Sequence, residues 1–190
     1  MATFTIFMMA AGLMADVTSE RGKGTLQRQL TAPIRTSTLV AGKMGAVFVF
    51  GVGEVFVIAL LGGLLLRARA PIVPFVLLSL SFVVATTGLL SAVYGLVRRE
   101  KQASELSSVI VMFSAIVGGA WLPLSSLPAP VRALAPVSVN YWAIKGYHAL
   151  LFEGAGVGGI LPSVIILGVA GVVLALLGSV LLGRSLRRGL

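Results

Sequence analysis

The feature that most constrains this chain is a series of long, almost uncharged apolar blocks. A helix needs roughly 20 consecutive apolar residues to cross the hydrocarbon core of a bilayer. Four blocks meet or approach that length, at residues 44–66, 72–97, 106–122 and 161–183. A fifth, shorter block covers residues 1–17. Because every backbone amide within a bilayer must be paired inside its own segment, we expect these blocks to be transmembrane helices.

Composition favours a membrane protein over a soluble one. Of the 190 residues, 57% are hydrophobic and 11% are charged, whereas about a quarter of a typical soluble chain is charged. Cysteine is absent, which excludes disulfides and thiolate metal sites. We therefore predict an all-α integral membrane protein in which residues 1–190 form a single domain with about five transmembrane helices.

Basic residues predict the orientation of the helices. If the blocks alternate in direction, segments 18–43, 98–105 and 184–190 share one side and carry eleven of the 15 Lys and Arg residues. The opposite side carries the other four: Arg67, Arg69, Arg132 and Lys145. Short loops rich in Lys and Arg are cytoplasmic, so we expect a multi-pass protein of a bacterial or archaeal cell membrane with a cytoplasmic C-terminus. The net charge of +9 then reflects topology and attraction to the lipid bilayer, and nucleic-acid binding is not expected.

The one long polar interruption, between the first two blocks, is predicted to contain a short amphipathic helix. Gly24 breaks the helix that leaves the first block, Thr25 is a suitable N-cap, and Pro33 ends the new helix. Leu26 and Leu30 then lie on one face. Two turns of helix are unstable alone, so this helix must lie against lipid headgroups or in a groove of a soluble partner.

The same interruption carries a family resemblance. It reads Glu20-Arg21-Gly22-Lys23-Gly24-Thr25-Leu26, followed by Leu30, Ala32-Pro33 and Gly42-Lys43. This resembles the signature of ABC type-2 transporter permeases, roughly E-R-x-x-G-T-L-x-x-L, then (T/S)-P, with G-K opening the next span. The sequence departs from the signature at Gln29, where the family usually has the second leucine of a pair. The order downstream also agrees, with three further spans, a proline-rich outer segment, a last span and a basic tail.

The resemblance implies that segment 18–43 holds the coupling helix of an ABC exporter. The residues that would contact the ATPase subunit are Glu20, Arg21, Gly24, Thr25, Leu26, Leu30 and Pro33. ATP and Mg would bind that separate subunit, because this chain has no G-x-x-x-x-G-K-[ST] phosphate loop. No catalytic residue, cofactor or metal is expected here. A second permease subunit, identical or different, is implied as well. The resemblance begins at the family's second span, so we expect the first span and its preceding interface helix to be missing.

Residues 123–153 form an outer segment that is too apolar for an ordinary loop and is interrupted by Pro123, Pro128, Pro130 and Pro136. Proline breaks helices, so the segment predicts two short re-entrant helices, residues 129–135 and 140–152. Tyr141, Lys145 and His148 would share one face of the second, with Trp142 beside them. The resemblance implies an outer lid over the translocation path, and the alternative is an interfacial anchor. His148 has no ligand-spaced partner, so no metal role is expected.

Glu54 is the residue within an apolar block that most needs an explanation. It follows Lys43 by eleven positions, which places it about 16 Å along the helix, near the bilayer midplane. A carboxylate there is costly unless it is neutral or paired. Glu54 therefore lines the substrate path, makes an interhelical or subunit contact, or is tolerated in its protonated form.

Two features of the apolar blocks indicate close packing. Residues 72–97 carry five hydroxyls that can bond carbonyls within the helix or face a polar neighbour: Ser79, Ser81, Thr86, Thr87 and Ser91. Several glycines permit close approach of helices: Gly88, Gly95, Gly118, Gly119, Gly168 and Gly171.

Taken together, the residues and the resemblance predict the membrane-spanning subunit of an ATP-driven exporter of drugs or other amphipathic molecules. Export of polysaccharide or glycolipid is the alternative within the same family. A membrane scaffold that transports nothing is the alternative outside it, with its cytoplasmic helix simply lying on lipid.

Overall fold

The computed structural model describes the chain over residues 3–12, 36–65, 71–97 and 100–187. All regular secondary structure within these ranges is helical, which confirms the predicted all-α membrane fold. An N-terminal helix covers Thr3–Gly12. The helices that follow are α3 (Thr36–Leu65), α4 (Ile72–Leu96), α5 (Glu100–Val117), η1 (Leu124–Ser126), α6 (Ala129–Leu134), η2 (Ala135–Val137), α7 (Val139–Phe152) and α8 (Val157–Arg187).

Several helices extend beyond the apolar blocks that predicted them. α3 begins at Thr36, within the segment 18–43 that we expected to be cytoplasmic, and α5 begins at Glu100 and ends at Val117 rather than covering residues 106–122. Hydropathy marks only the apolar part of a helix, whereas backbone hydrogen bonds continue through polar residues at its ends. Among the described helices, Ile72–Leu96 and Val157–Leu181 are long and apolar enough to cross a membrane. The number of crossings therefore stays a prediction.

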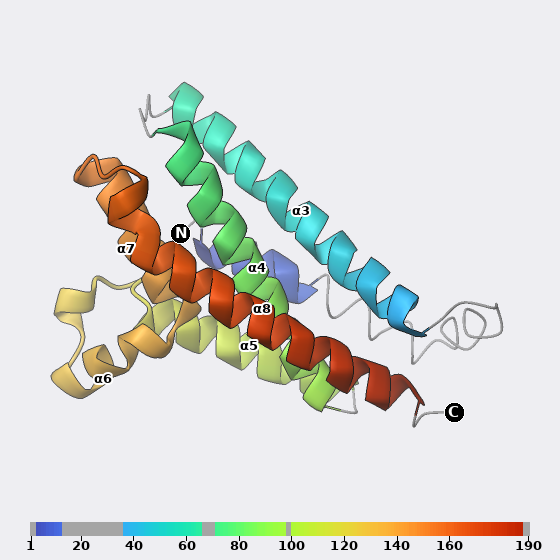
Figure 1. The fold of residues 1–190 in the computed structure, drawn as a ribbon. Coiled ribbons are helices and arrows are strands. Elements are labelled where there is room, and N and C mark those ends of the chain that lie inside the picture. Colours follow the sequence, from blue (N-terminus) through green and yellow to red (C-terminus); the bar gives the residue numbers. More distant parts are fainter. Residues whose placement is uncertain (1–2, 13–35, 66–70, 98–99, 188–190) are drawn as a thin grey trace.

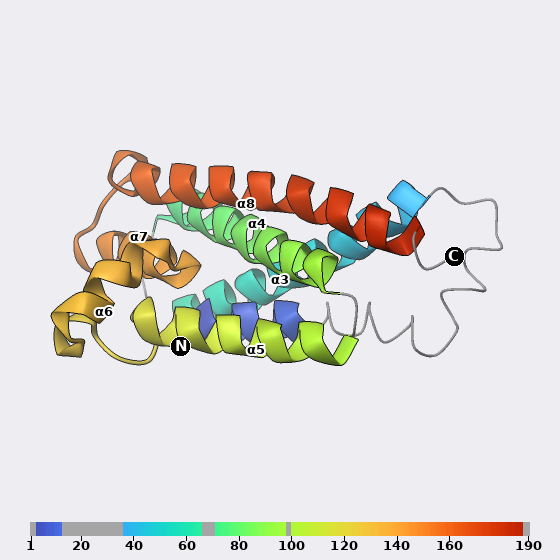
Figure 2. The same cartoon turned by 90° about the horizontal axis from the view of Figure 1, so that it is seen from below.

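α4 lies at the centre of the arrangement. α8 packs along one side of α4, while the N-terminal helix and α5 lie on the opposite side and α3 runs alongside (Figure 1, Figure 2). Consecutive long helices run in opposite directions, so α6 and α7 gather at the end of the bundle where α5 ends and α8 begins (Figure 2). The far end holds the start of α3 and the end of α8.

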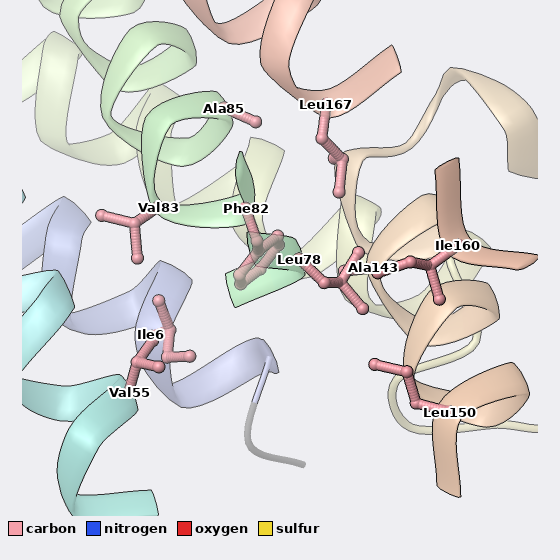
Figure 3. Packing of buried hydrophobic residues seen from close by; sticks show 10 residues of the cluster. All are labelled: Ile6, Val55, Leu78, Phe82, Val83, Ala85, Ala143, Leu150, Ile160 and Leu167. Atoms are coloured by element: carbon pink, nitrogen blue, oxygen red, sulfur yellow. The ribbon is translucent and has the colours of Figure 1, made fainter. Parts of the chain in front are cut away.

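The core consists of two clusters of buried apolar side chains, and the N-terminal helix contributes to both. Phe7 of that helix packs with Leu90 and Tyr94 of α4 and with side chains of α3 and α5. In the second cluster, Ile6 lies beside Val55 of α3 and Val83 of α4, while side chains of α4, α7 and α8 meet farther along (Figure 3). The Thr3–Gly12 helix is therefore an integral part of the bundle.

The contact between α4 and α8 is built on small residues, as expected for two of the glycines singled out above. A Cβ added to Gly171 would lie 2.6 Å from the backbone nitrogen of Ala85, and one added to Gly88 would clash with the carbonyl oxygen of Gly171. Side chains larger than hydrogen would force these helices apart. Gly168, on the same helix, does not share this role, because a Cβ added there would meet nothing within 4 Å.

Four of the five hydroxyls of α4 take one of the two predicted roles, whereas the Thr87 Oγ1 is buried without a hydrogen-bond partner among the described residues. Ser81, Thr86 and Ser91 bond carbonyls three or four residues earlier in the helix, as the Ser91 Oγ does with Gly88 at 2.8 Å. Ser79 instead faces the phenol of Tyr147 on α7. Large apolar side chains remain exposed along α3, α5 and α8, among them Phe56, Phe113 and Leu176. Such continuous apolar faces suit contact with lipid rather than water.

Candidate functional site

The predicted coupling residues lie outside the described part of the chain. These are Glu20, Arg21, Gly24, Thr25, Leu26, Leu30 and Pro33, so their role stays a prediction. The structure does describe the helices on either side of them. The N-terminal helix runs toward the end of the bundle from which α3 starts, opposite α6 and α7 (Figure 1, Figure 2).

Tyr94 of α4 contacts the end of the N-terminal helix. Its side chain is 1% exposed, and its hydroxyl donates a hydrogen bond to the carbonyl oxygen of Ala11 at 3.4 Å. Ala11 is the next-to-last residue of the N-terminal helix, where carbonyls lack partners within the helix. The bond therefore fixes the exit of this helix to α4.

Glu54 lies between two residues of α3 that pack inward. Gly51 approaches Val83 of α4, with a Cβ position only 2.7 Å from the Val83 side chain, and Val55 belongs to the second core cluster. The Glu54 side chain is half-buried, and its Oε2 is fully buried without a hydrogen-bond partner among the described residues. An unpaired buried carboxylate oxygen needs a proton or a partner from elsewhere. The unpaired oxygen agrees with the expectation that Glu54 needs a proton or a partner. The three roles considered for Glu54 stay predictions.

The four residues assigned to the outer lid are brought together on α7. Trp142 is positioned by a hydrogen bond of 2.8 Å from its Nε1 to the carbonyl oxygen of Pro136, and its ring meets Tyr141 edge-on at 5.2 Å. The Lys145 ammonium lies 5.3 Å from the Trp142 ring centroid. His148 contacts Glu153 at 3.2 Å in an exposed pair. α6 and α7 agree closely with the two predicted short helices, and their role as a lid stays a prediction.

α7 also packs against α4 and α8. The hydroxyls of Ser79 and Tyr147 are 2.7 Å apart, with Ser79 fully buried. One residue earlier, Gly146 lies so close to α4 and α8 that a Cβ there would be 2.7 Å from Leu78 and 3.3 Å from the Cβ of Ser163. The sequence indicated that Ser79 could face a polar neighbour, but the identity of the neighbour depends on the three-dimensional arrangement.

A second polar contact of the outer segment, in which Ser114 of α5 meets Ser138 and Asn140, was not predicted from the sequence. The sequence signal is weak: buried polar groups must find partners, but small polar residues are common in membrane helices and their spacing does not identify the partner. Within the described residues, no group of three or more His, Asp or Glu side chains could hold a metal ion.

The fold and these contacts define a helical membrane protein with a polar segment joined to one end and short helices packed over the other. Residues 1–152 match the family described as ABC-2 type transporter. The chain therefore belongs to this family, and the predicted ABC type-2 permease is confirmed. It is a membrane-embedded permease component of an ABC transporter and works with an ABC ATPase. A search of curated proteins finds no match.

Proposed function

We propose that this permease exports amphipathic molecules, drugs among them, from the cytoplasm of a bacterium or archaeon, powered by ATP hydrolysis on a separate subunit. Two such chains would enclose the path, and two ATPase subunits would contact the segment from Gly24 to Pro33. The observation that carries the proposal is that α3, which follows the predicted coupling residues, starts at one end of the bundle, whereas α6 and α7 lie at the other (Figure 1, Figure 2). In the sequence, eleven of the 15 Lys and Arg residues fall in segments 18–43, 98–105 and 184–190, as expected for segments on the cytoplasmic side.

The proposed coupling follows from this arrangement. When the ATPase pair closes on ATP, it would push on the predicted helix that contains Leu26 and Leu30. That movement reaches the N-terminal helix and α3, which flank the segment, and Tyr94 passes it to α4 through its bond with Ala11. α7 packs on α4 and α8 at the opposite end. A displacement of α4 is thus able to move the outer helices.

Glu54 supports the choice of an amphipathic substrate. Its Oε2 is buried with no partner among the described residues, and the next residue in the helix, Val55, belongs to the second core cluster. A molecule that combines an apolar body with a cationic or hydroxyl group would satisfy this oxygen while contacting the apolar surroundings. A polar contact with a second subunit would satisfy it equally well, and the two roles predict different variant behaviour.

The experiment uses inside-out vesicles that contain the permease with its co-purifying ATPase, and tetraphenylphosphonium as a lipophilic cation. We expect ATP-dependent uptake of the cation. Glu54→Gln abolishes uptake with assembly intact if Glu54 lines the path, and disrupts assembly if it forms a subunit contact. Glu105→Gln, at an exposed position on α5, is the matched control. Uptake without ATP, or ATP-driven movement of a lipid-linked glycan instead of the cation, would contradict the proposed function.

A further inference from the structure

Three buried polar side chains join the outer segment to α5. Ser114 is near the end of α5, Ser138 immediately precedes α7, and Asn140 is in its first turn. Their exposed fractions are 5%, 6% and 0%. The two serine hydroxyls are 2.8 Å apart, the Ser138 hydroxyl lies 2.9 Å from the Ser114 carbonyl oxygen, and the Asn140 Nδ2 lies 3.4 Å from the Ser114 Oγ. We call this group the α5–α7 joint.

The protons of the α5–α7 joint can be assigned from its donors and acceptors. The Ser138 hydroxyl has one proton and donates it to the carbonyl oxygen of Ser114. The hydroxyl of Ser114 must then donate to the Ser138 Oγ, and the Asn140 amide nitrogen donates to the Ser114 Oγ. This chain of bonds ends with the Asn140 Oδ1 buried and unpaired among the described residues. Exchanging the amide oxygen and nitrogen would move the unpaired group from acceptor to donor without removing it.

The joint is also closely packed, at a glycine. A Cβ added to Gly118 would lie 2.5 Å from both the Ser114 carbonyl oxygen and the Ser138 Oγ, and 2.7 Å from the Asn140 Cβ. The following residue, Gly119, has a φ of 85°, in the left-handed region that favours glycine. α5 therefore ends in a tight turn against the start of α7, and the unpaired amide oxygen is enclosed by protein.

The other attachment of α7, to α4 and α8, differs in its hydrogen bonding. There the Ser79 and Tyr147 hydroxyls pair with each other at 2.7 Å. Ala143 and Leu150 of α7 are fully buried in the second core cluster with Ile160 of α8 (Figure 3). This attachment combines apolar burial with a satisfied polar pair, whereas the α5–α7 joint retains an unsatisfied amide.

We propose that the α5–α7 joint is the contact that separates when the outer end of the permease opens, while α7 stays bound to α4 and α8. A buried acceptor without a donor destabilises the closed arrangement, and separation would let water or the polar group of the substrate reach the Asn140 Oδ1. Separating α7 from α4 and α8 would instead break the Ser79–Tyr147 hydrogen bond and expose buried apolar side chains. The inference rests on the proposed function, because it describes how the outer end of a transport path opens.

Paired cysteines test which attachment moves, and the chain offers a background without native cysteine. Ser114→Cys with Ser138→Cys spans the α5–α7 joint, whose two Oγ atoms are 2.8 Å apart. The matched pair, Gly146→Cys with Ser163→Cys, joins α7 to α8, where the two Cβ positions are 3.3 Å apart, close to the separation in disulfides. Because the new Cβ at position 146 also comes within 2.7 Å of the end of the Leu78 side chain, the reduced pair is first shown to transport as the unmodified permease does. Both are oxidised with copper-phenanthroline in the vesicles that contain the ATPase and then reduced with dithiothreitol.

The two pairs have opposite expected results. Oxidation of the Ser114/Ser138 pair abolishes ATP-dependent uptake of tetraphenylphosphonium and reduction restores it, while the Gly146/Ser163 pair transports in both states. Full transport by the oxidised Ser114/Ser138 pair, or a block only in the Gly146/Ser163 pair, overturns the inference. The proposed function fails separately, if the unmodified permease shows no ATP-dependent uptake.

Labelling provides a readout that needs no transport substrate and no disulfide. Single variants Ser138→Cys and Ser163→Cys, each with the ATPase present, are treated with a water-soluble maleimide before and after ATP is added. Both positions are buried in the closed arrangement. We expect labelling at position 138 to increase about tenfold with ATP and labelling at position 163 to stay constant, because only the first becomes hydrated. The inference is contradicted if ATP changes labelling equally at both positions, or increases it at position 163 alone.

Discussion

Gly88 of α4 and Gly171 of α8 face each other at a distance that leaves no space for a side chain. A Cβ at Gly88 would clash with the Gly171 carbonyl oxygen, and a Cβ at Gly171 would lie 2.6 Å from the Ala85 backbone nitrogen. Backbone atoms cannot yield as the end of a flexible side chain can. The two helices are therefore held together by close backbone packing. α7 packs against both of them.

Gly171→Ala is expected to lower the melting temperature of the detergent-solubilised protein, because the added methyl group separates α4 from α8. The cost of such overpacking is about 1–3 kcal/mol. Gly168→Ala on the same helix is the matched control, since its added Cβ meets nothing within 4 Å. Alanine also has the higher helix propensity, so this control is neutral or slightly stabilising. Equal melting temperatures for the two variants would contradict the close packing described for Gly171.

The residue ranges of the helices could be predicted from the sequence much better than which helices pack against each other. The apolar block at residues 72–97 coincides with α4, Ile72–Leu96, because continuous apolar residues in a bilayer leave the backbone no alternative to helix. The four prolines of the outer segment likewise located α6 and α7. Hydropathy does not encode which apolar face meets which, because lipid and protein interiors are equally apolar. The pairing of α4 with α8 could therefore not be derived.

Of the candidate functional residues, some could be identified from the sequence and others only from the fold. Glu54 was identified because a carboxylate in an apolar block is costly whatever surrounds it, and the structure adds that its Oε2 is buried without a partner among the described residues. Ser114, Ser138 and Asn140 were missed, because small polar residues are common in membrane helices. Only the fold brings together Ser114 and Asn140, which are 26 positions apart in the chain.

A double-mutant cycle of Ser79→Ala and Tyr147→Phe measures the attachment of α7 to α4. Each single change removes one hydroxyl of the 2.7 Å pair and leaves the packing of the ring and of the Cβ atom in place. We expect a coupling free energy of unfolding of about 0.5–1.5 kcal/mol. A tyrosine phenol keeps its proton well above neutral pH, so the coupling should be the same at pH 6 and pH 8. Strictly additive effects of the two changes would show that the pair does not stabilise the attachment.

Tyr94→Phe tests the proposed route from the N-terminal helix to α4. The change keeps the buried ring and removes the hydroxyl that bonds the Ala11 carbonyl oxygen at 3.4 Å. We expect ATPase co-purification to be unchanged and the number of tetraphenylphosphonium ions moved per ATP hydrolysed to fall, because the ATPase still binds but its movement reaches α4 less effectively. Ser81→Ala, which also removes one hydroxyl from α4 but one that bonds the Leu77 carbonyl oxygen of the same helix, is the control. An unaltered ratio of transport to hydrolysis in Tyr94→Phe would remove Tyr94 from the coupling route.

Co-purification of the ATPase with the permease tests the central claim most directly, that segment 18–43 is the contact for the energy-supplying subunit. Leu26→Asp with Leu30→Asp places two charges on the predicted apolar face, and Gln27→Asp with Thr31→Asp places two charges at the same spacing on a neighbouring face. All variants are first shown to be present in the membrane at equal amounts. We predict that the Leu26/Leu30 variant loses the ATPase while the Gln27/Thr31 variant retains it. Retention of the ATPase by the Leu26/Leu30 variant would contradict the account.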